Sequence, residues 1–355
     1  MGNMKTGSNN DITDVPGVKV GHVSLISGQG KLIPGNGPVR TGVTAILPHS
    51  GNIYRQPCSA GIHVFNGFGK SIGTPFVIEN GYIMAPVMLT NVLSVADVSR
   101  GLTTYMLGEN PEIGDYGRTP NLTIFECDDQ HLNDVRGRHV RPIDAVTALQ
   151  RASSAPMEQG NVGAGVGMSC YELKGGIGSA SRIVEPEGDR HTLGIVALTN
   201  FGHLDELIIE GVPVGKLLNT YSGGYLPGSL IIIGITDAPL SRWQLQRLAQ
   251  RAFLGMARTG GNSHTGSGEF CLMISNHQPS VNLERIADNR SHTVENEGIS
   301  DWEMDDYYRA AVEATAESIW NSLFMAETME GRDGNIRYAL PIQETLEIIQ
   351  NFRKG

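Results

Sequence analysis

A single serine between two glycines, Ser267 in the segment 262–270 (NSHTGSGEF), has the surroundings of a nucleophile. Gly266 and Gly268 can adopt backbone angles closed to other residues, and they present no Cβ to an approaching carbonyl. The loop before the serine adds hydroxyls and an imidazole, and an apolar strand is predicted directly after it. The composition alone also fits an ordinary turn, but these three features together favour a reactive hydroxyl.

Attack of the Ser267 hydroxyl on the carbonyl of Gly266 would cleave the chain between these two residues. Such an N-to-O acyl shift, followed by hydrolysis, leaves Ser267 as a new chain terminus with a free α-amino group. This amine has an ordinary pKa of about 7.7–8.0, so it can take the proton of the hydroxyl on its own residue. The segment therefore predicts autocleavage between Gly266 and Ser267.

A Ser-His-Asp triad is the competing interpretation. The nucleophile-elbow pattern Gly-x-Ser-x-Gly needs a glycine two residues before the serine, where this chain has Thr265. The chain has ten histidines, but no spacing connects one of them to Ser267.

Strands and helices with clear patterns must position this serine. The runs 191–202 (HTLGIVALTNFG) and 228–240 (GSLIIIGITDAPL) are continuously apolar, which is typical of central strands covered on both faces. The segment 242–258 has apolar residues at helical spacing, and Asp237 or Ser241 could cap its start. Further helices are predicted after residue 91, near residue 142 and over 304–325.

The first part of the chain predicts short strands, and the whole predicts one domain. The runs GVKVGHVSL, GVTAILP and AGIHVFNG suggest consecutive strands of a meander. The polar stretch 276–297 is expected to be an exposed excursion. Because no period repeats and no linker divides the chain, we expect residues 1–355 to form a single domain of two packed sheets flanked by helices.

Composition excludes several classes of protein. A formal net charge of -10 argues against a nucleic-acid partner. Nowhere do 18 apolar residues run together, so we expect no membrane span and a cytoplasmic protein. The four cysteines are scattered, as buried thiols of a reducing compartment would be. Without a clustered His/Cys/Asp/Glu pattern, neither a metal nor another cofactor is predicted.

The junction segment 257–275 (ARTGGNSHTGSGEFCLMIS) resembles the self-processing junction of the L-aminopeptidase/D-esterase (DmpA) family of N-terminal-nucleophile serine hydrolases. The resemblance is specific because it extends over nearly the whole chain in family order. The other matching segments are 10–22, 126–137, 160–182, 200–215, 236–252 and 326–334.

The resemblance implies an α/β protein with a four-layer αββα sandwich, like that of the ornithine acetyltransferases. It implies cleavage into residues 1–266 and 267–355, which stay associated in a homo-oligomer, a tetramer of cleaved heterodimers. The mature enzyme would release N-terminal L-, D- or β-amino acids from short peptides, amides or esters through an acyl-enzyme on Ser267. An acyltransferase is disfavoured, because the ornithine acetyltransferases cleave before threonine. An uncleaved binding protein of the same fold is the third possibility.

Residue roles follow from the same resemblance. Ser267 matches the family nucleophile. A family Ser-x-Glu is best matched by Thr315-Ala316-Glu317, and Glu313 is the alternative acid. The family's oxyanion donor is an asparagine; Asn200 is expected over Asp237, because a carboxylate cannot donate a hydrogen bond.

Further residues are candidates for contact with the substrate. Backbone amides of Gly163 and Gly165 could supply a second oxyanion donor. Tyr171 resembles a tyrosine near the catalytic centre, although a core aromatic fits equally well. The acids of the ECDD segment, Glu126, Asp128 and Asp129, could meet the substrate's ammonium or bind structural turns.

Overall fold

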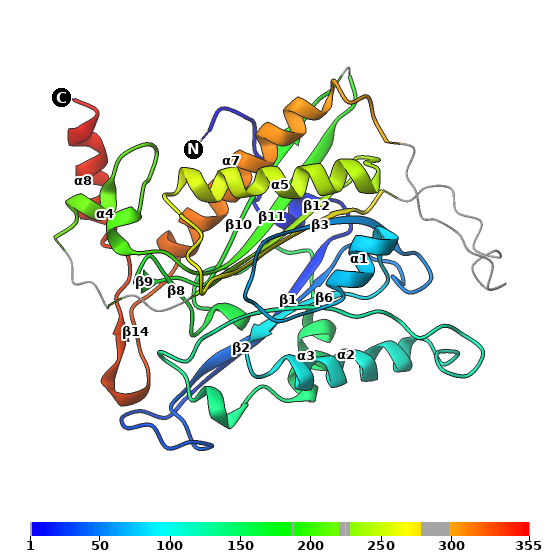
Figure 1. Cartoon of the computed structure of the whole chain (residues 1–355), viewed down its shortest axis with the longest axis horizontal. Coiled ribbons are helices and arrows are strands. Elements are labelled where there is room, and N and C mark those ends of the chain that lie inside the picture. Colours follow the sequence, from blue (N-terminus) through cyan, green and yellow to red (C-terminus); the bar gives the residue numbers. More distant parts are fainter. Residues whose placement is uncertain (1, 187, 220–223, 225–227, 278–297, 355) are drawn as a thin grey trace.

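Two β-sheets lie face to face and carry helices on their outer faces (Figure 1). This computed structural model describes residues 2–186, 188–219, 224, 228–277 and 298–354. Sheet one has the order β1 (Lys19–Ser27), β2 (Val39–Leu47), β6 (Val87–Asn91), β7 (Thr123–Cys127) and β4 (Ser71–Ile72). Sheet two has the order β10 (Ile177–Val184), β11 (His191–Asn200), β12 (Ser229–Thr236), β13 (Gly268–Ser275), β3 (Cys58–Gly67) and β5 (Tyr82–Ile83).

Each sheet has its own pair of long helices. Sheet two is covered by α5 (Arg242–Arg258) and α7 (Met304–Phe324), and sheet one by α2 (Val95–Glu109) and α3 (Pro142–Arg151). Shorter elements complete the described chain: α1 (Thr74–Asn80), α4 (Val214–Leu217), α8 (Ile342–Phe352) and the strand pairs β8–β9 (Ser169–Cys170, Leu173–Lys174) and β14–β15 (Met329–Glu330, Ile336–Arg337).

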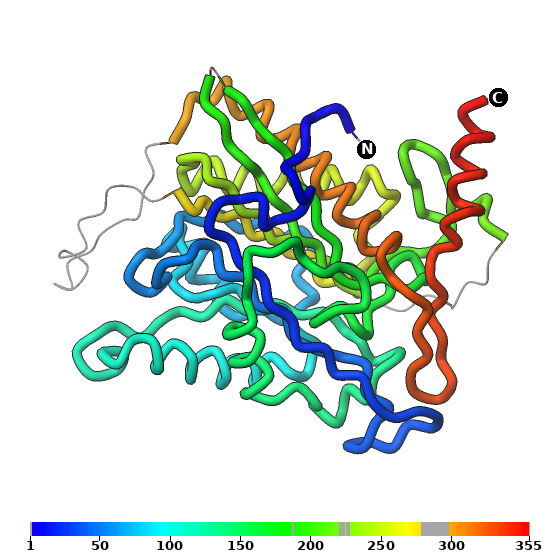
Figure 2. Tube along the Cα trace, turned by 180° about the vertical axis from the view of Figure 1, so that it is seen from behind, coloured from blue at the N-terminus to red at the C-terminus, as the bar shows by residue number. Residues whose placement is uncertain are grey.

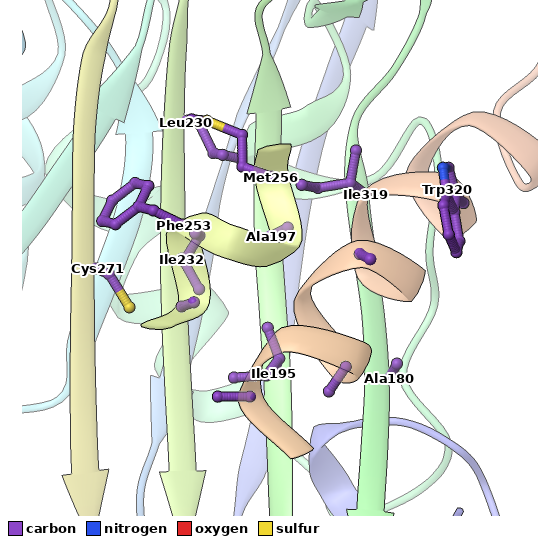
Figure 3. Close-up of a cluster of buried hydrophobic side chains, with 14 of the residues drawn as sticks. Ala180, Ile195, Ala197, Leu230, Ile232, Phe253, Met256, Cys271, Ile319 and Trp320 are labelled. Atoms are coloured by element: carbon purple, nitrogen blue, oxygen red, sulfur yellow. The ribbon is translucent and has the colours of Figure 1, made fainter. Parts of the chain in front are cut away.

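Three hydrophobic clusters separate the four layers. On β13, Cys271 points to the cluster under α5 and α7, together with Ile195 and Ile232 (Figure 3). Its neighbour Leu272 points to the cluster between the sheets, because successive side chains of a strand face opposite sides. The third cluster, which includes Met88, lies between sheet one and helices α2 and α3. The predicted αββα sandwich is confirmed.

β13 is the strand that Ser267 precedes, and it lies in the interior of sheet two. It pairs in parallel with β12, where Gly268 is opposite Ser229, and antiparallel with β3, where Gly268 is opposite Gly67. α5 makes the connection between β12 and β13, and Ser241 caps it: the Ser241 hydroxyl accepts a hydrogen bond from the Gln244 N–H. Ser241, not Asp237, is therefore the cap.

The predicted meander is wrong in one respect. β1 and β2 pair with each other, but β3 crosses to sheet two and lies beside β13. The long apolar runs do form the central strands β11 and β12, as predicted. Most of the polar stretch 276–297 lies outside the described residues.

The N-terminal segment runs along β10 and reaches α7, as the tube in Figure 2 shows. The N–H of Ile183 donates to the carbonyl of Lys5 at 2.8 Å, and the N–H of Met4 donates to the Glu313 carboxylate at 3.1 Å. No helix in the described part of the chain combines the length and apolar character needed to cross a bilayer.

Candidate active site

Ser267 lies at the end of a tight turn that leads into β13. Its N–H donates to the carbonyl of His264 at 2.8 Å, and the N–H of Gly268 donates to the carbonyl of Gly228 and the Ser229 hydroxyl, both at 3.2 Å. The Ser267 side chain is buried, and its Oγ has no hydrogen-bond partner of good geometry among the residues described. Because buried hydroxyls are normally bonded, an uncommitted one suggests a reactive role.

Glu269 lies two residues after Ser267, so both side chains are on the same face of β13. Its carboxylate is buried; one oxygen accepts a hydrogen bond from the Ser263 hydroxyl, and the other has no partner in the described chain. Burial raises the pKa of Glu269, against the lowering effect of the Ser263 and Ser267 hydroxyls and of His264. Sequence reasoning missed this acid, although residues two apart in a strand always share a face.

Two adjoining hollows open at this end of sheet two. The smaller is lined by Ser267, Glu269, Ser263, His264, Phe201, Gly202 and Gly228. The larger shares Phe201 and Gly202 and is further lined by Asp128, Gln130, His131, Ser169, Glu172, Asn200 and Arg337. A substrate bound at Ser267 therefore has a polar, charged space beside it.

Tyr171 forms part of the wall behind these hollows. It is fully buried, and its ring lies 5.1 Å from the ring of Phe201 and close under Gly202. Its hydroxyl is 2.8 Å from the Thr259 hydroxyl, which itself donates to the carbonyl of Met256. The structure thus places Tyr171 near the site, but as a packing residue whose hydroxyl is already engaged.

Asn200 lies at the same end of sheet two as Ser267. It is opposite Ser229, which is opposite Gly268, so its backbone is two strands, or about 10 Å, away. Its amide is engaged: Oδ1 accepts from the N–H of Ser169 at 2.9 Å, and Nδ2 donates to the carbonyl of Asp128 at 2.8 Å.

Asp237, the competing candidate, lies at the opposite end of the sheet. It follows Thr236, which is opposite Ser275, about 23 Å along β13 from Gly268. Its carboxylate accepts a hydrogen bond from the N–H of Thr192 at 2.7 Å. Of the two candidates, only Asn200 is on the side of the nucleophile.

The structure corrects the prediction that Thr315 and Glu317 serve the nucleophile. Both carboxylates of α7, Glu317 and the alternative Glu313, form ion pairs with the fully buried Arg182. Arg182 on β10 is level with Ser275, the far end of β13. Thr315 packs against Gly255 where α7 crosses α5. These residues connect elements of the core and do not reach Ser267.

Gly163 and Gly165 also have structural roles instead of the predicted one. The N–H of Gly163 donates to the Ser24 hydroxyl at 2.8 Å, and the N–H of Gly165 donates to the carbonyl of Val162 at 2.8 Å. A Cβ on Gly163 would lie 2.3 Å from the Thr44 hydroxyl. Glycine is therefore needed for close packing on sheet one, and both amides are committed.

Glu126, by contrast, approaches the backbone of Gly268 from sheet one. It is buried, and its carboxylate accepts a hydrogen bond from the N–H of Lys70 at 2.7 Å. Burial raises its pKa to about 6. Gly69 separates Glu126 from Gly268, and a Cβ on Gly69 would lie 3.6 Å from the Glu126 carboxylate and 3.2 Å from the Gly268 Cα.

The other two acids of the ECDD segment differ in their surroundings. Asp128 lines the larger hollow, whereas Asp129 is buried and accepts a hydrogen bond from the Asn133 amide at 3.0 Å. Within the described ranges, no three His, Cys, Asp or Glu side chains are grouped as metal ligands would be.

Comparisons with known proteins find relatives over nearly the whole length of this chain. The model of peptidase family S58 matches residues 10–337. The β-peptidyl aminopeptidase BapA of Sphingosinicella microcystinivorans is 39% identical over 99% of this chain and 90% of its own length.

Solved structures are similar over nearly the full length of both chains. The PH0078 protein from Pyrococcus horikoshii OT3 matches with a TM-score of 0.93 and 48% identity, covering 99% of this chain and 97% of its own. The L-aminopeptidase D-Ala-esterase/amidase from Ochrobactrum anthropi, described as a prototype for the serine aminopeptidases and a variant of the Ntn hydrolase fold, matches with a TM-score of 0.90 and 32% identity over 99% and 97%.

Proposed function

This chain belongs to peptidase family S58 and is a serine aminopeptidase, and we propose that it activates itself by cleavage between Gly266 and Ser267. The buried, unbonded hydroxyl of Ser267 carries this proposal. Its Oγ attacks the carbonyl carbon of Gly266, and the peptide C–N bond breaks to give an ester. Water then hydrolyses the ester. The products are a carboxylate on Gly266 and a free hydroxyl and α-amino group on Ser267.

The same hydroxyl then serves substrate turnover. The neutral α-amine of Ser267 takes the proton from Oγ as the oxygen attacks the substrate's carbonyl. The protonated amine next gives that proton to the leaving amine, and water hydrolyses the acyl-enzyme. Glu269, on the same strand face, stabilises the ammonium form by a charge-assisted hydrogen bond. Asn200 remains the proposed oxyanion donor, and it must turn from the carbonyl of Asp128 to act.

The substrates we propose are short peptides, amides or esters with a free N-terminal L-, D- or β-amino acid. The names of the relatives, a β-peptidyl aminopeptidase and an L-aminopeptidase D-Ala-esterase/amidase, support this range. Glu126 supports it, because a buried carboxylate near the backbone of Gly268, the residue after Ser267, suits the substrate's ammonium group.

A cytoplasmic tetramer of cleaved heterodimers is a further part of the proposal. All four cysteines are buried and unpaired, which suits a reducing compartment. Sedimentation of the purified enzyme should give a mass of four copies of each fragment, and a monomeric mass would contradict the tetramer.

Fragment analysis tests the proposed cleavage directly. Purified enzyme should separate under denaturing conditions into residues 1–266 and 267–355, with a new N-terminus reading Ser-Gly-Glu-Phe. Ser267→Ala should stay uncut and inactive on aminoacyl amides. Ser275→Ala, which changes the buried serine at the other end of β13, should still be cut. A fully active wild type with an unbroken chain would refute the mechanism.

The role of Glu126 predicts that a free amine is required. N-acetylated aminoacyl amides should be turned over at least about tenfold more slowly than free ones. Glu126→Gln should raise KM for the free amides and leave the acetylated ones unaffected. Equal kinetics on both substrate forms would remove Glu126 from the substrate site.

A further inference from the structure

The precursor turn before Ser267 is held by two side chains whose hydrogen bonds in the described chain all go to residues before the scissile bond. We infer that Asn66 and Glu206 form a clamp that positions the precursor for self-cleavage and takes no part in later turnover. The inference rests on the proposed cleavage between Gly266 and Ser267.

Asn66 holds the two carbonyls that immediately precede the scissile one. Its Nδ2 donates to the carbonyl of His264 at 3.0 Å and to that of Thr265 at 3.4 Å. The His264 carbonyl also accepts from the N–H of Ser267, which closes the turn. The carbonyls of the two residues before Gly266 are therefore fixed, which restricts the orientation of the Gly266–Ser267 peptide.

A bulge in β3 explains how Asn66 reaches the turn. Asn66 is opposite Glu269, but the next pair along is Val64 and Phe270, so Phe65 is the extra residue on β3. Bulges beside active sites change the direction in which a side chain points. Here the bulge brings an amide donor to a turn that the regular ladder would not contact.

Glu206 holds the loop one step earlier in the chain. Its carboxylate accepts from Asn262 Nδ2 at 2.8 Å and pairs with His264 Nε2 at 3.0 Å. The N–H of His203 also donates to it, at 2.9 Å. Burial acts to raise the pKa of Glu206, but these donors together hold the pKa below its usual value. The Glu206 carboxylate that holds the loop is therefore charged at neutral pH.

The contacts are asymmetric about the cleavage point. In the described chain, the side-chain hydrogen bonds of Asn66 and Glu206 go to Asn262, His264, Thr265 and His203, all of which belong to the 1–266 fragment. Neither side chain lines the hollow at Ser267. The Asn66 and Glu206 side chains should therefore be needed for cleavage of the Gly266–Ser267 bond, and not for substrate turnover after it.

Cell-free synthesis followed by gel analysis measures the cleavage rate of Asn66→Ala and Asn66→Asp against the wild type. We expect cleavage to slow about tenfold for the alanine, the effect of losing roughly one hydrogen bond. We expect a larger loss for the aspartate, which presents an acceptor to the two carbonyls. The kcat and KM per cleaved molecule should not be impaired. Asn80→Ala is the matched control, because its amide also donates to a backbone carbonyl, at 3.1 Å, but within α1.

Each outcome decides the inference. Cleavage of both Asn66 variants at the wild-type rate overturns the clamp while the proposed function stands. Parallel losses in cleavage and in turnover per cleaved molecule also overturn it, because the residue then serves the substrate. A wild type that never yields a chain starting at Ser267 overturns the proposed cleavage and the clamp together. If the Asn66 variants have a lowered thermal midpoint in a Ser267→Ala background, Glu206→Gln decides by the same criteria.

Discussion

Two buried glutamates in this molecule have opposite surroundings. Glu269 has a free carboxylate oxygen beside the nucleophile, whereas Glu317 is neutralised by Arg182 and accepts a further hydrogen bond from Asn10 at 2.8 Å. An acid that is already paired contributes to the fold, while one left partly unpaired can meet a charge that appears later. The ammonium group that the proposed cleavage would create on Ser267 is such a charge.

Glu269→Gln tests this assignment at the residue scale. An opposite charge raises the pKa of an amine, so its removal should lower the pKa of the Ser267 α-amine. The acidic limb of the kcat/KM profile should then move to lower pH, while kcat falls about tenfold. A pH–rate series on aminoacyl amides measures both effects. An unchanged acidic limb would remove Glu269 from contact with the amine.

A buried ionic cluster of Arg182, Glu313 and Glu317, which lies away from the candidate active site, joins elements of the fold. Arg182 on β10 pairs with Glu313 and Glu317 on α7, and Glu313 also accepts hydrogen bonds from the N-terminal segment. Buried ions are costly unless paired. The group therefore fixes α7 and the N-terminal segment on the same strand.

Glu317→Gln should lower stability without affecting catalysis. The free energy of unfolding should fall by about 3 kcal/mol, because Arg182 loses one of its two buried partners. Turnover per folded molecule should stay at the wild-type level. Denaturant unfolding and steady-state kinetics measure the two quantities. Glu185→Gln, at the exposed pair with Lys5, is the control and should change stability by less than about 1 kcal/mol. A large loss of kcat in Glu317→Gln would contradict its structural role.

Local patterns in the sequence predicted the elements better than their partners. The apolar runs of β11 and β12 and the helical spacing of α5 were sufficient, since burial and periodicity are local properties. Contacts between distant elements could not be predicted. The pairing of Arg182 with Glu317 joins residues far apart in the chain, and although donor chemistry favoured Asn200 over Asp237, only strand register shows which of them lies at the end of the sheet near Ser267. Glu269 could have been found from the strand period alone. The C-terminal helix α8 was not anticipated.

The two fragments share a single structure at the scale of the whole molecule. The proposed second fragment contributes β13 and α7, and the first contributes β12, β3 and α5, with β13 between β12 and β3. Each fragment alone would leave exposed the apolar faces of the two hydrophobic clusters that both fragments build, the cluster under α5 and α7 and the cluster between the sheets. Cleavage should therefore not separate them under native conditions.

Refolding should differ between the cut and the uncut molecule. Uncut Ser267→Ala folds as one chain, so its recovery from denaturant should not depend on protein concentration in dilute solution. The cut enzyme must bring two chains together, so its recovery should fall on dilution. Far-UV circular dichroism after refolding at a series of concentrations measures both. Identical recovery at all concentrations would mean that the fragments fold independently.

The position of the break within sheet two also bears on how long each copy lasts. A protein cleaved in a surface linker can unfold and refold, but the proposed cleavage would interrupt this chain immediately before an interior strand. Each molecule folds readily only as the uncut precursor, because after cleavage two separate chains would have to find each other to refold. The lifetime of the mature enzyme would then be set by its rate of unfolding, and unfolded molecules would be replaced by new synthesis.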